Sequence, residues 1–171
     1  MLATPEPPEL GPGPRPGVQS ELELTEKLQE FFRAGKLPAE KQELVRALVF
    51  LWHDHLESAH AIAQDIDTAD GAFVHAIMHR REPDYGNAKY WFRRVGKHPA
   101  FGELSSGAGS LLEQRGNRDL GQLLLPNGQW DPFAFVDACE QVKRKATHEE
   151  ALLREIQRIE TENLLNWFAG G

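Results

Sequence analysis

The stretch at residues 75–99, HAIMHRREPDYGNAKYWFRRVGKHP, contains two helical patterns separated by a turn. The first pattern predicts a helix from about Asp70, a favoured helix-capping residue, to about Arg81. The second predicts a shorter helix over 87–95, ended by Gly96. The residues between them that favour a turn are Pro83, Asp84 and Gly86. The stretch therefore predicts a helix–turn–helix unit.

The charge of this stretch is opposite to that of the rest of the chain. Residues 75–99 hold six Lys or Arg and two Asp or Glu, a balance of +4. The whole 171-residue chain has a net charge of −7, so the remaining residues carry −11. An acidic chain is poorly suited to general nucleic-acid binding, whereas a basic island on an acidic body favours a local site for a small anion.

A long helix is predicted before this unit. Apolar residues recur at helical spacing along one side of residues 38–66, so we expect one continuous helix over this range. A shorter helix precedes it, because Ser20 and Glu23 have the spacing of a capping box and Gly35 suits a helix end.

The part of the chain after this unit predicts further helices. Residues 97–117 are rich in Gly and Ser, so we expect mostly loop there. Asp131-Pro132 suits the start of one helix, and Thr147 with Glu150 repeats the capping-box spacing before the last one. The pattern as a whole predicts an all-α fold of about six helices with an irregular middle region.

The length and composition predict one helical domain with a tail. Residues 1–17, MLATPEPPELGPGPRPG, contain six prolines and three glycines, so we expect a disordered tail followed by a single domain at 18–171. No apolar run is long enough for a membrane span, and no secretory signal pattern is visible. Cys139 is the single cysteine, which excludes an internal disulfide. We expect a cytoplasmic protein with neither a membrane nor a nucleic-acid partner.

Histidines gather on two of the predicted helices. In WHDHLESAH, residues 52–60, Glu57 and His60 have the Glu-x-x-His spacing of metal sites in helical bundles. His75 and His79 are one turn apart, so both can reach one ion. The short link between the helices favours antiparallel pairing. The sequence thus predicts a divalent-metal site formed by Glu57, His60, His75 and His79.

Two other interpretations of these residues stay open. In a metal-free polar pocket, His55, His79 and Glu82 would be the catalytic acids and bases, since histidine titrates near neutral pH. Alternatively, each histidine is a hydrogen-bonded residue at the edge of the core, with a structural role alone.

Arginines and aromatic residues around the turn predict a site for a small anionic or hydroxylated ligand. Arginine recognises carboxylates and phosphates, and aromatic rings line polar pockets. The predicted ligand-binding residues are Arg80, Arg81, Asp84, Asn87, Tyr90, Trp91, Arg93 and His98. The alternative is that the arginines pair with nearby acids and the aromatic rings belong to the core. No phosphate-binding Gly-rich loop or Gly-x-Ser-x-Gly motif is present, which argues against nucleoside triphosphate chemistry and serine hydrolysis.

The segment WHDHLESAH followed by HAIMHRREPDYGNAKYWFRRVGKHP resembles a family of uncharacterised proteins of bacteria, fungi and plants. The resemblance covers about residues 48–101 and implies no particular activity. The matching positions are His55, His60, His79, Arg80, Arg81, Glu82, Asp84, Asn87, Tyr90, Trp91 and His98.

These observations predict a small helical protein with a pocket of histidines, arginines and aromatic residues. The leading hypothesis is a metal-dependent or acid–base enzyme acting on a small anionic or hydroxylated ligand. The alternative is a non-catalytic interaction module that docks an acidic protein through the basic island. The sequence leaves the reaction type and the oligomeric state open.

Overall fold

The computed structural model describes residues 2–35, 37–145 and 149–170. Within these ranges the chain is helical and contains no strand, which confirms the predicted all-α class. The elements are α1 (Glu21–Ala34), α2 (Ala39–Trp52), α3 (Leu56–Ala63), α4 (Ala69–Arg81), α5 (Tyr85–Val95), α6 (Phe101–Gln114), α7 (Arg118–Leu124), the 3₁₀ turn η1 (Pro126–Gly128), α8 (Pro132–Lys145) and α9 (Glu150–Phe168). The prediction of about six helices is wrong, because the described ranges contain nine α-helices.

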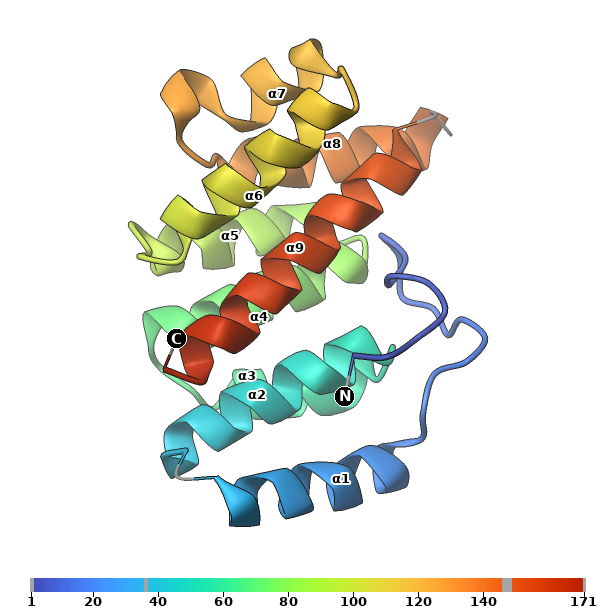
Figure 1. Ribbon diagram of the computed structural model, residues 1–171, viewed down its shortest axis with the longest axis vertical. Helices are drawn as coiled ribbons and strands as arrows, with labels where there is room; N and C mark the ends of the chain where they lie inside the picture. The colour runs from blue at the N-terminus through green and yellow to red at the C-terminus, as the bar shows by residue number, and fades with distance from the viewer. Residues whose placement is uncertain (1, 36, 146–148, 171) are drawn as a thin grey trace.

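The helices form one compact domain, in which α1 to α5 are stacked in chain order. In Figure 1, α1 lies at one end and α7 at the other, with α4 and α5 between them. α4 packs most extensively against α5, as the predicted helix–turn–helix requires. The last helix, α9, returns across the stack and contacts α2, α6 and α8.

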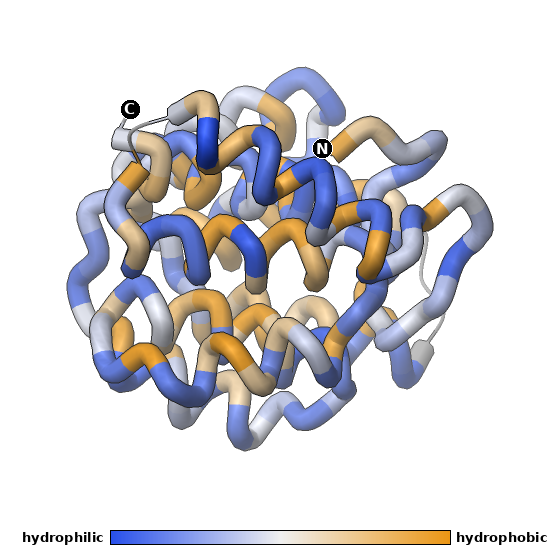
Figure 2. Tube along the Cα trace, turned by 90° about the horizontal axis from the view of Figure 1, so that it is seen from below, coloured by the Kyte–Doolittle hydropathy of each residue, from blue (hydrophilic) through white to orange (hydrophobic). Residues whose placement is uncertain are grey.

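One hydrophobic core runs through the stack. Its fully buried side chains include Leu24, Leu48, Phe73, Phe92 and Phe135, which come from five different helices. Figure 2 shows hydrophobic positions recurring along the helices in the middle of the molecule, with hydrophilic segments towards the outside. None of the described helices is long and apolar enough to cross a membrane.

The helix predicted over 38–66 is two helices. α2 ends at Trp52, a turn at residues 53–55 follows, and α3 begins at Leu56. Asp54 in this turn has φ +67°, in the left-handed region that few non-glycine residues adopt. The apolar spacing in the sequence runs on across residues 53–55 and therefore gives no sign of the break. The turn depends instead on contacts of Asp54 with distant parts of the chain.

The loop predicted at 97–117 is largely a helix, α6. Leu104, Ala108 and Leu112 are spaced four residues apart and are buried, so tertiary packing outweighs the low helix propensity of the Gly-rich sequence. Gly107 has a packing role, because a Cβ atom there would lie 2.9 Å from Ile159 Cγ2 on α9. The glycine therefore permits the close approach of α6 and α9.

The helix ends agree with the sequence in part. Ser20 and Glu23 form the predicted capping box of α1, and Gly35 ends that helix. Thr68, rather than the predicted Asp70, caps α4. The capping role predicted for Thr147 lies outside the described residues.

The N-terminal segment, for which the composition predicts a disordered tail, lies along the helices and contacts them. Leu10 and Arg15 are buried, with 1% and 6% of their surface exposed. Arg154 and Gln157 of α9 donate hydrogen bonds to the carbonyls of Pro7, Pro8 and Glu9. The backbone carbonyls of a proline-rich stretch lack partners of their own, so side chains of the helical body satisfy them.

Candidate functional site: a three-histidine cluster

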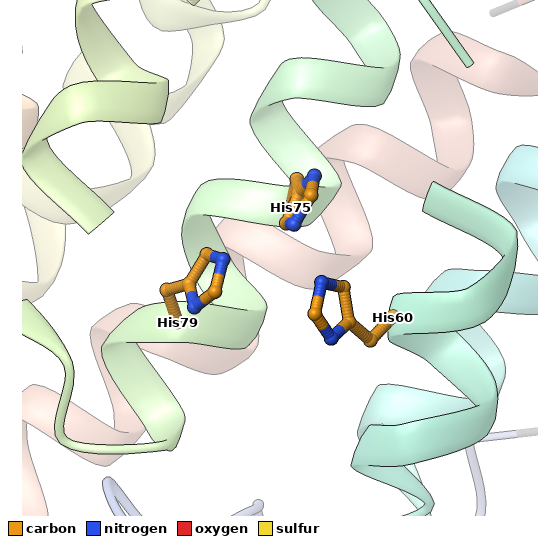
Figure 3. A group of neighbouring side chains, drawn as sticks. All are labelled: His60, His75 and His79. Atoms are coloured by element: carbon orange, nitrogen blue, oxygen red, sulfur yellow. The ribbon is translucent and has the colours of Figure 1, made fainter. Parts of the chain in front are cut away.

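Three histidines from two helices meet at one place. His75 and His79 lie one turn apart on α4, and His60 faces them from α3, as Figure 3 shows. One ring nitrogen from each lies within 4.8 Å of the others. The ring centroids are 4.7 Å apart for His60 and His75, and 5.2 Å apart for His60 and His79. The predicted approach of the two histidine-bearing helices is therefore present.

His75 is buried at the centre of the cluster without a hydrogen bond. Its side chain stacks on Trp91 of α5, with ring centroids 3.9 Å apart, and neither ring nitrogen has a hydrogen-bond partner among the described residues. Burial lowers the pKa of His75 to about 4, and the positive charges of His79, His60 and Arg94 add to this effect. The imidazole is consequently neutral at physiological pH, with a free lone pair.

His79 is held from two sides. Glu82 Oε2 lies 3.2 Å from Nδ1, and the Asn87 side-chain amide lies 3.1 Å from Nε2. Burial lowers the pKa of His79 below its usual value, although the nearby Glu82 carboxylate acts in the opposite direction. A carboxylate on one ring nitrogen of a histidine fixes the tautomer and orients the other nitrogen.

The other histidine and acid of the α3 region lie apart from the cluster. Glu57, predicted as a metal ligand, is exposed on α3, one turn before His60. His55, predicted as a catalytic residue, precedes α3, and its Nε2 hydrogen-bonds the Gln19 carbonyl at 2.7 Å. The described residues that converge are therefore His60, His75 and His79, with Glu82 beside them.

The two arginines at the end of α4 point into the protein. Arg80 is fully buried and forms a two-pronged ion pair with Glu160 of α9, with N–O distances of 3.1 and 2.5 Å. Its guanidinium also lies 4.4 Å from the centre of the Phe135 ring. Arg81 is buried and pairs with Asp54 at 2.6 Å. Internal partners thus engage both arginines that the sequence predicts as ligand-binding.

The remaining predicted ligand-binding residues are scattered. Asp84 caps α5 by accepting a hydrogen bond from the Asn87 backbone N–H. Tyr90 and Arg93 are exposed on α5. His98 is buried elsewhere, where its Nε2 lies 2.9 Å from Asp70 Oδ1. Of the eight, the side chains of Asn87 and Trp91 contact the histidine cluster.

Arg94 is a residue at this site that the sequence prediction missed. Its guanidinium lies 5.0 Å from the centre of the Trp91 ring, and it pairs with the exposed Asp67 at 2.6 Å. The spacing of Asn87, Trp91 and Arg94 puts all three on one helical face, so the signal was present in the sequence.

A separate open groove of about 850 Å³ lies between the start of α6 and residues 126–133. His98 is the one predicted site residue that lines it. Gly, Ser, Asn and Gln residues make up much of its wall, and the three clustered histidines lie outside it.

Comparison of the chain with protein-family models, with curated proteins and with solved structures gives no significant match. The family resemblance of residues 48–101 stays a prediction.

Proposed function

We propose that the protein is a metal-dependent enzyme whose divalent ion binds His60, His75 and His79. The observation that carries the proposal is the buried, unpartnered imidazole of His75, which faces two other histidines. A buried polar group without a partner is costly, and natural proteins rarely keep one without a reason. A metal ion ligated by the three rings would supply the partner.

Ligand chemistry favours Zn²⁺. Neutral imidazole nitrogens suit zinc, and three protein ligands with one open position are typical of catalytic zinc sites. Nitrogens on one tetrahedral zinc lie about 3.4 Å apart, given bonds of about 2.1 Å. The histidine nitrogens lie within 4.8 Å of one another. Side-chain rotations that move these nitrogens by about 1 Å would therefore bring them to the spacing that zinc requires.

The chemistry that such a site supplies is water activation. A water molecule in the fourth position of a three-histidine zinc site has its pKa lowered to about 7 and becomes a nucleophile at neutral pH. Glu82 would orient His79 through Nδ1, and Nε2 would bind the ion in place of its present contact with the Asn87 amide. We infer a hydrolytic reaction on a small polar substrate.

Metal binding and activity test the proposal together. Untagged protein, purified without chelator and reconstituted with Zn²⁺, is expected to retain one equivalent after desalting and to hydrolyse activated esters or phosphate esters in a zinc-dependent way. His75→Ala should lose both properties. His98→Gln is the matched control, because His98 is an equally buried histidine outside the cluster. Wild-type protein that retains no zinc would overturn the proposal.

A further inference from the structure

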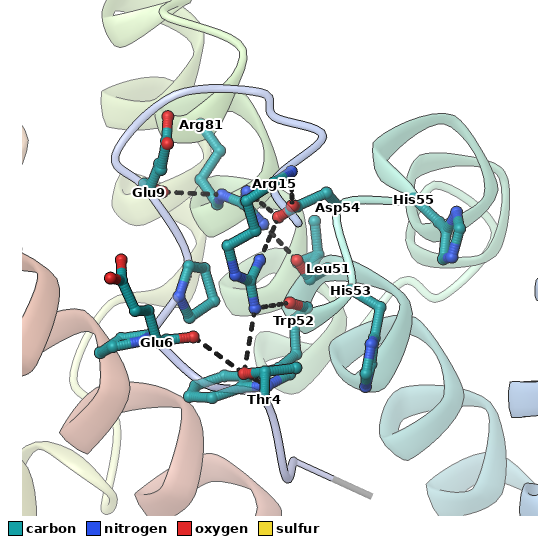
Figure 4. A network of polar contacts seen from close by, with 12 residues as sticks. Thr4, Glu6, Glu9, Arg15, Leu51, Trp52, His53, Asp54, His55 and Arg81 are labelled. Atoms are coloured by element: carbon teal, nitrogen blue, oxygen red, sulfur yellow. Dashed lines mark hydrogen bonds and ion pairs between the residues drawn. The ribbon is translucent and has the colours of Figure 1, made fainter. Parts of the chain in front are cut away.

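The turn between α2 and α3 is held by the N-terminal segment. All three side chains of the turn bind residues 15–19: His53 Nδ1 accepts the Gln19 N–H at 3.1 Å, His55 Nε2 donates to the Gln19 carbonyl, and Asp54 binds Arg15. Figure 4 shows the part of this network in which Arg15 and Arg81 converge on Asp54. A turn whose every side chain is bound to one distant segment depends on that segment for its shape.

Asp54 is shared by two buried arginines. The Arg15 backbone N–H and Nη1 lie 2.9 and 2.5 Å from its carboxylate oxygens, and Arg81 Nη2 lies 2.6 Å away. The left-handed backbone of Asp54 costs free energy, and such conformations persist where surrounding contacts fix them. Arg15 and Arg81 provide those contacts.

The same two arginines end α2. Arg15 Nη2 donates to the Trp52 carbonyl at 2.7 Å, and Arg81 Nη1 donates to the Leu51 carbonyl. The last carbonyls of a helix have no partner within it, so donors placed there fix where the helix stops. Arg15 and Arg81 together therefore stabilise the break between α2 and α3, which gives α3 its own direction.

This network connects both halves of the histidine cluster. Arg81 lies two residues after His79 on α4, and Asp54 lies six residues before His60, which α3 carries. The Asp54–Arg81 contact joins the start of α3 to the end of α4. Arg15 holds the other side of the same carboxylate.

From this geometry we propose that Arg15 and Asp54 are positioning residues for the metal site, and that the N-terminal segment sets the metal affinity by fixing where α3 presents His60. The proposal rests on the proposed metal-binding function. It assigns to residues 15–19 a role in the site although they lie outside it. Outer residues that orient metal ligands typically change metal affinity by about 10–100-fold when removed.

The segment has a second anchor, which offers a matched control. Arg154 of α9 donates hydrogen bonds to the Pro7 and Pro8 carbonyls, at 2.6 and 3.4 Å, and forms an ion pair with Glu6. Like Arg15, it is an arginine that ties the N-terminal segment to the body. Unlike Arg15, it makes no hydrogen bond or ion pair with the turn at residues 53–55 among the described contacts.

The test compares Arg15→Gln with Arg154→Gln in the full chain. Zn²⁺ affinity is measured by competition with a chromophoric chelator, the Co²⁺ absorption spectrum reports ligand geometry, and thermal unfolding reports stability. Arg15→Gln should weaken Zn²⁺ binding by about tenfold and alter the Co²⁺ spectrum. Arg154→Gln should lower the melting temperature without either effect. Arg15→Lys should recover part of the affinity, since it keeps a cation beside Asp54.

The outcomes separate this inference from the proposed function. Wild-type Zn²⁺ affinity in Arg15→Gln, with or without lower stability, would overturn the positioning role and leave the metal site standing. No metal binding by the wild type would overturn both. If Arg15→Gln does not fold, His55→Ala takes its place, because it removes one contact with Gln19 from a half-buried position. The same loss of affinity is expected, and unchanged affinity would count against the role.

Discussion

The indole of Trp91 lies flat against the imidazole of His75, with ring centroids 3.9 Å apart and planes inclined by 21°. This contact covers one face of the histidine whose nitrogens have no hydrogen bond. Trp91 therefore maintains the low pKa of His75 by keeping water from the ring.

Replacement of Trp91 by alanine should raise the pKa of His75 in the metal-free protein. The value should move from about 4 towards the ordinary value of about 6.5, because water would hydrate the charged form. NMR titration of the histidine ring protons measures the change. Tyr90→Ala is the control, since the neighbouring Tyr90 ring is half exposed. An equal shift in both variants, or none in Trp91→Ala, would contradict this account.

The metal-free protein should lose stability as the pH falls from about 6.5 to about 4. The folded pKa of His75 is about 4, so in this window the unfolded chain takes up a proton that the folded chain does not. The groups that face His75 are His60, His79 and Arg94, and their positive charges act in the same direction. Urea unfolding across the window should show a smaller decline for His75→Gln than for the wild type. Parallel declines would show that His75 does not carry the effect.

Breaking the Arg80–Glu160 pair should be costly. Both side chains are fully buried, and removing one partner leaves an uncompensated charge, so Glu160→Gln is expected to cost about 3 kcal/mol in the free energy of unfolding. Asp67→Asn breaks the exposed pair with Arg94 and should change stability little. Urea unfolding of both variants makes the comparison. A Glu160→Gln variant as stable as Asp67→Asn would show that the buried pair is dispensable.

Gly71 should not accept a side chain. A Cβ atom there would lie 2.2 Å from the Ile66 carbonyl oxygen, so Gly71→Ala must move the turn before α4 and should cost about 2 kcal/mol. Gly102→Ala in α6 meets nothing within 4 Å and should stabilise by up to about 1 kcal/mol, through helix propensity. Thermal unfolding distinguishes the two signs, and a stabilised Gly71→Ala would contradict the packing described.

Local sequence features predicted the helix–turn–helix at residues 75–99 and the meeting of His60 with His75 and His79. The turn residues and the one-turn histidine spacing are properties of neighbouring positions, and the structure has the corresponding α4, α5 and histidine cluster. Such patterns do not depend on where the rest of the chain goes.

Features that depend on distant contacts could not be predicted in this way. The break at Asp54 needs Arg15 and Arg81, and the internal role of Arg80 needs Glu160, which lies 80 residues away. The helical state of the Gly-rich α6 depends on packing against α9. In each case the deciding partner is remote in sequence, so periodicity and spacing carry no signal of it.

The central claim is that His60, His75 and His79 ligate one metal ion. X-ray absorption at the zinc edge of the reconstituted protein tests it most directly. The first shell gives the number of ligand atoms and their distance from zinc, and the outer-shell scattering of imidazole rings gives the number of histidine ligands. We expect three imidazole nitrogens and one further light atom at about 2.0–2.1 Å, and loss of one imidazole in His60→Ala. A shell made mainly of carboxylate oxygens, or one unchanged in His60→Ala, would contradict it.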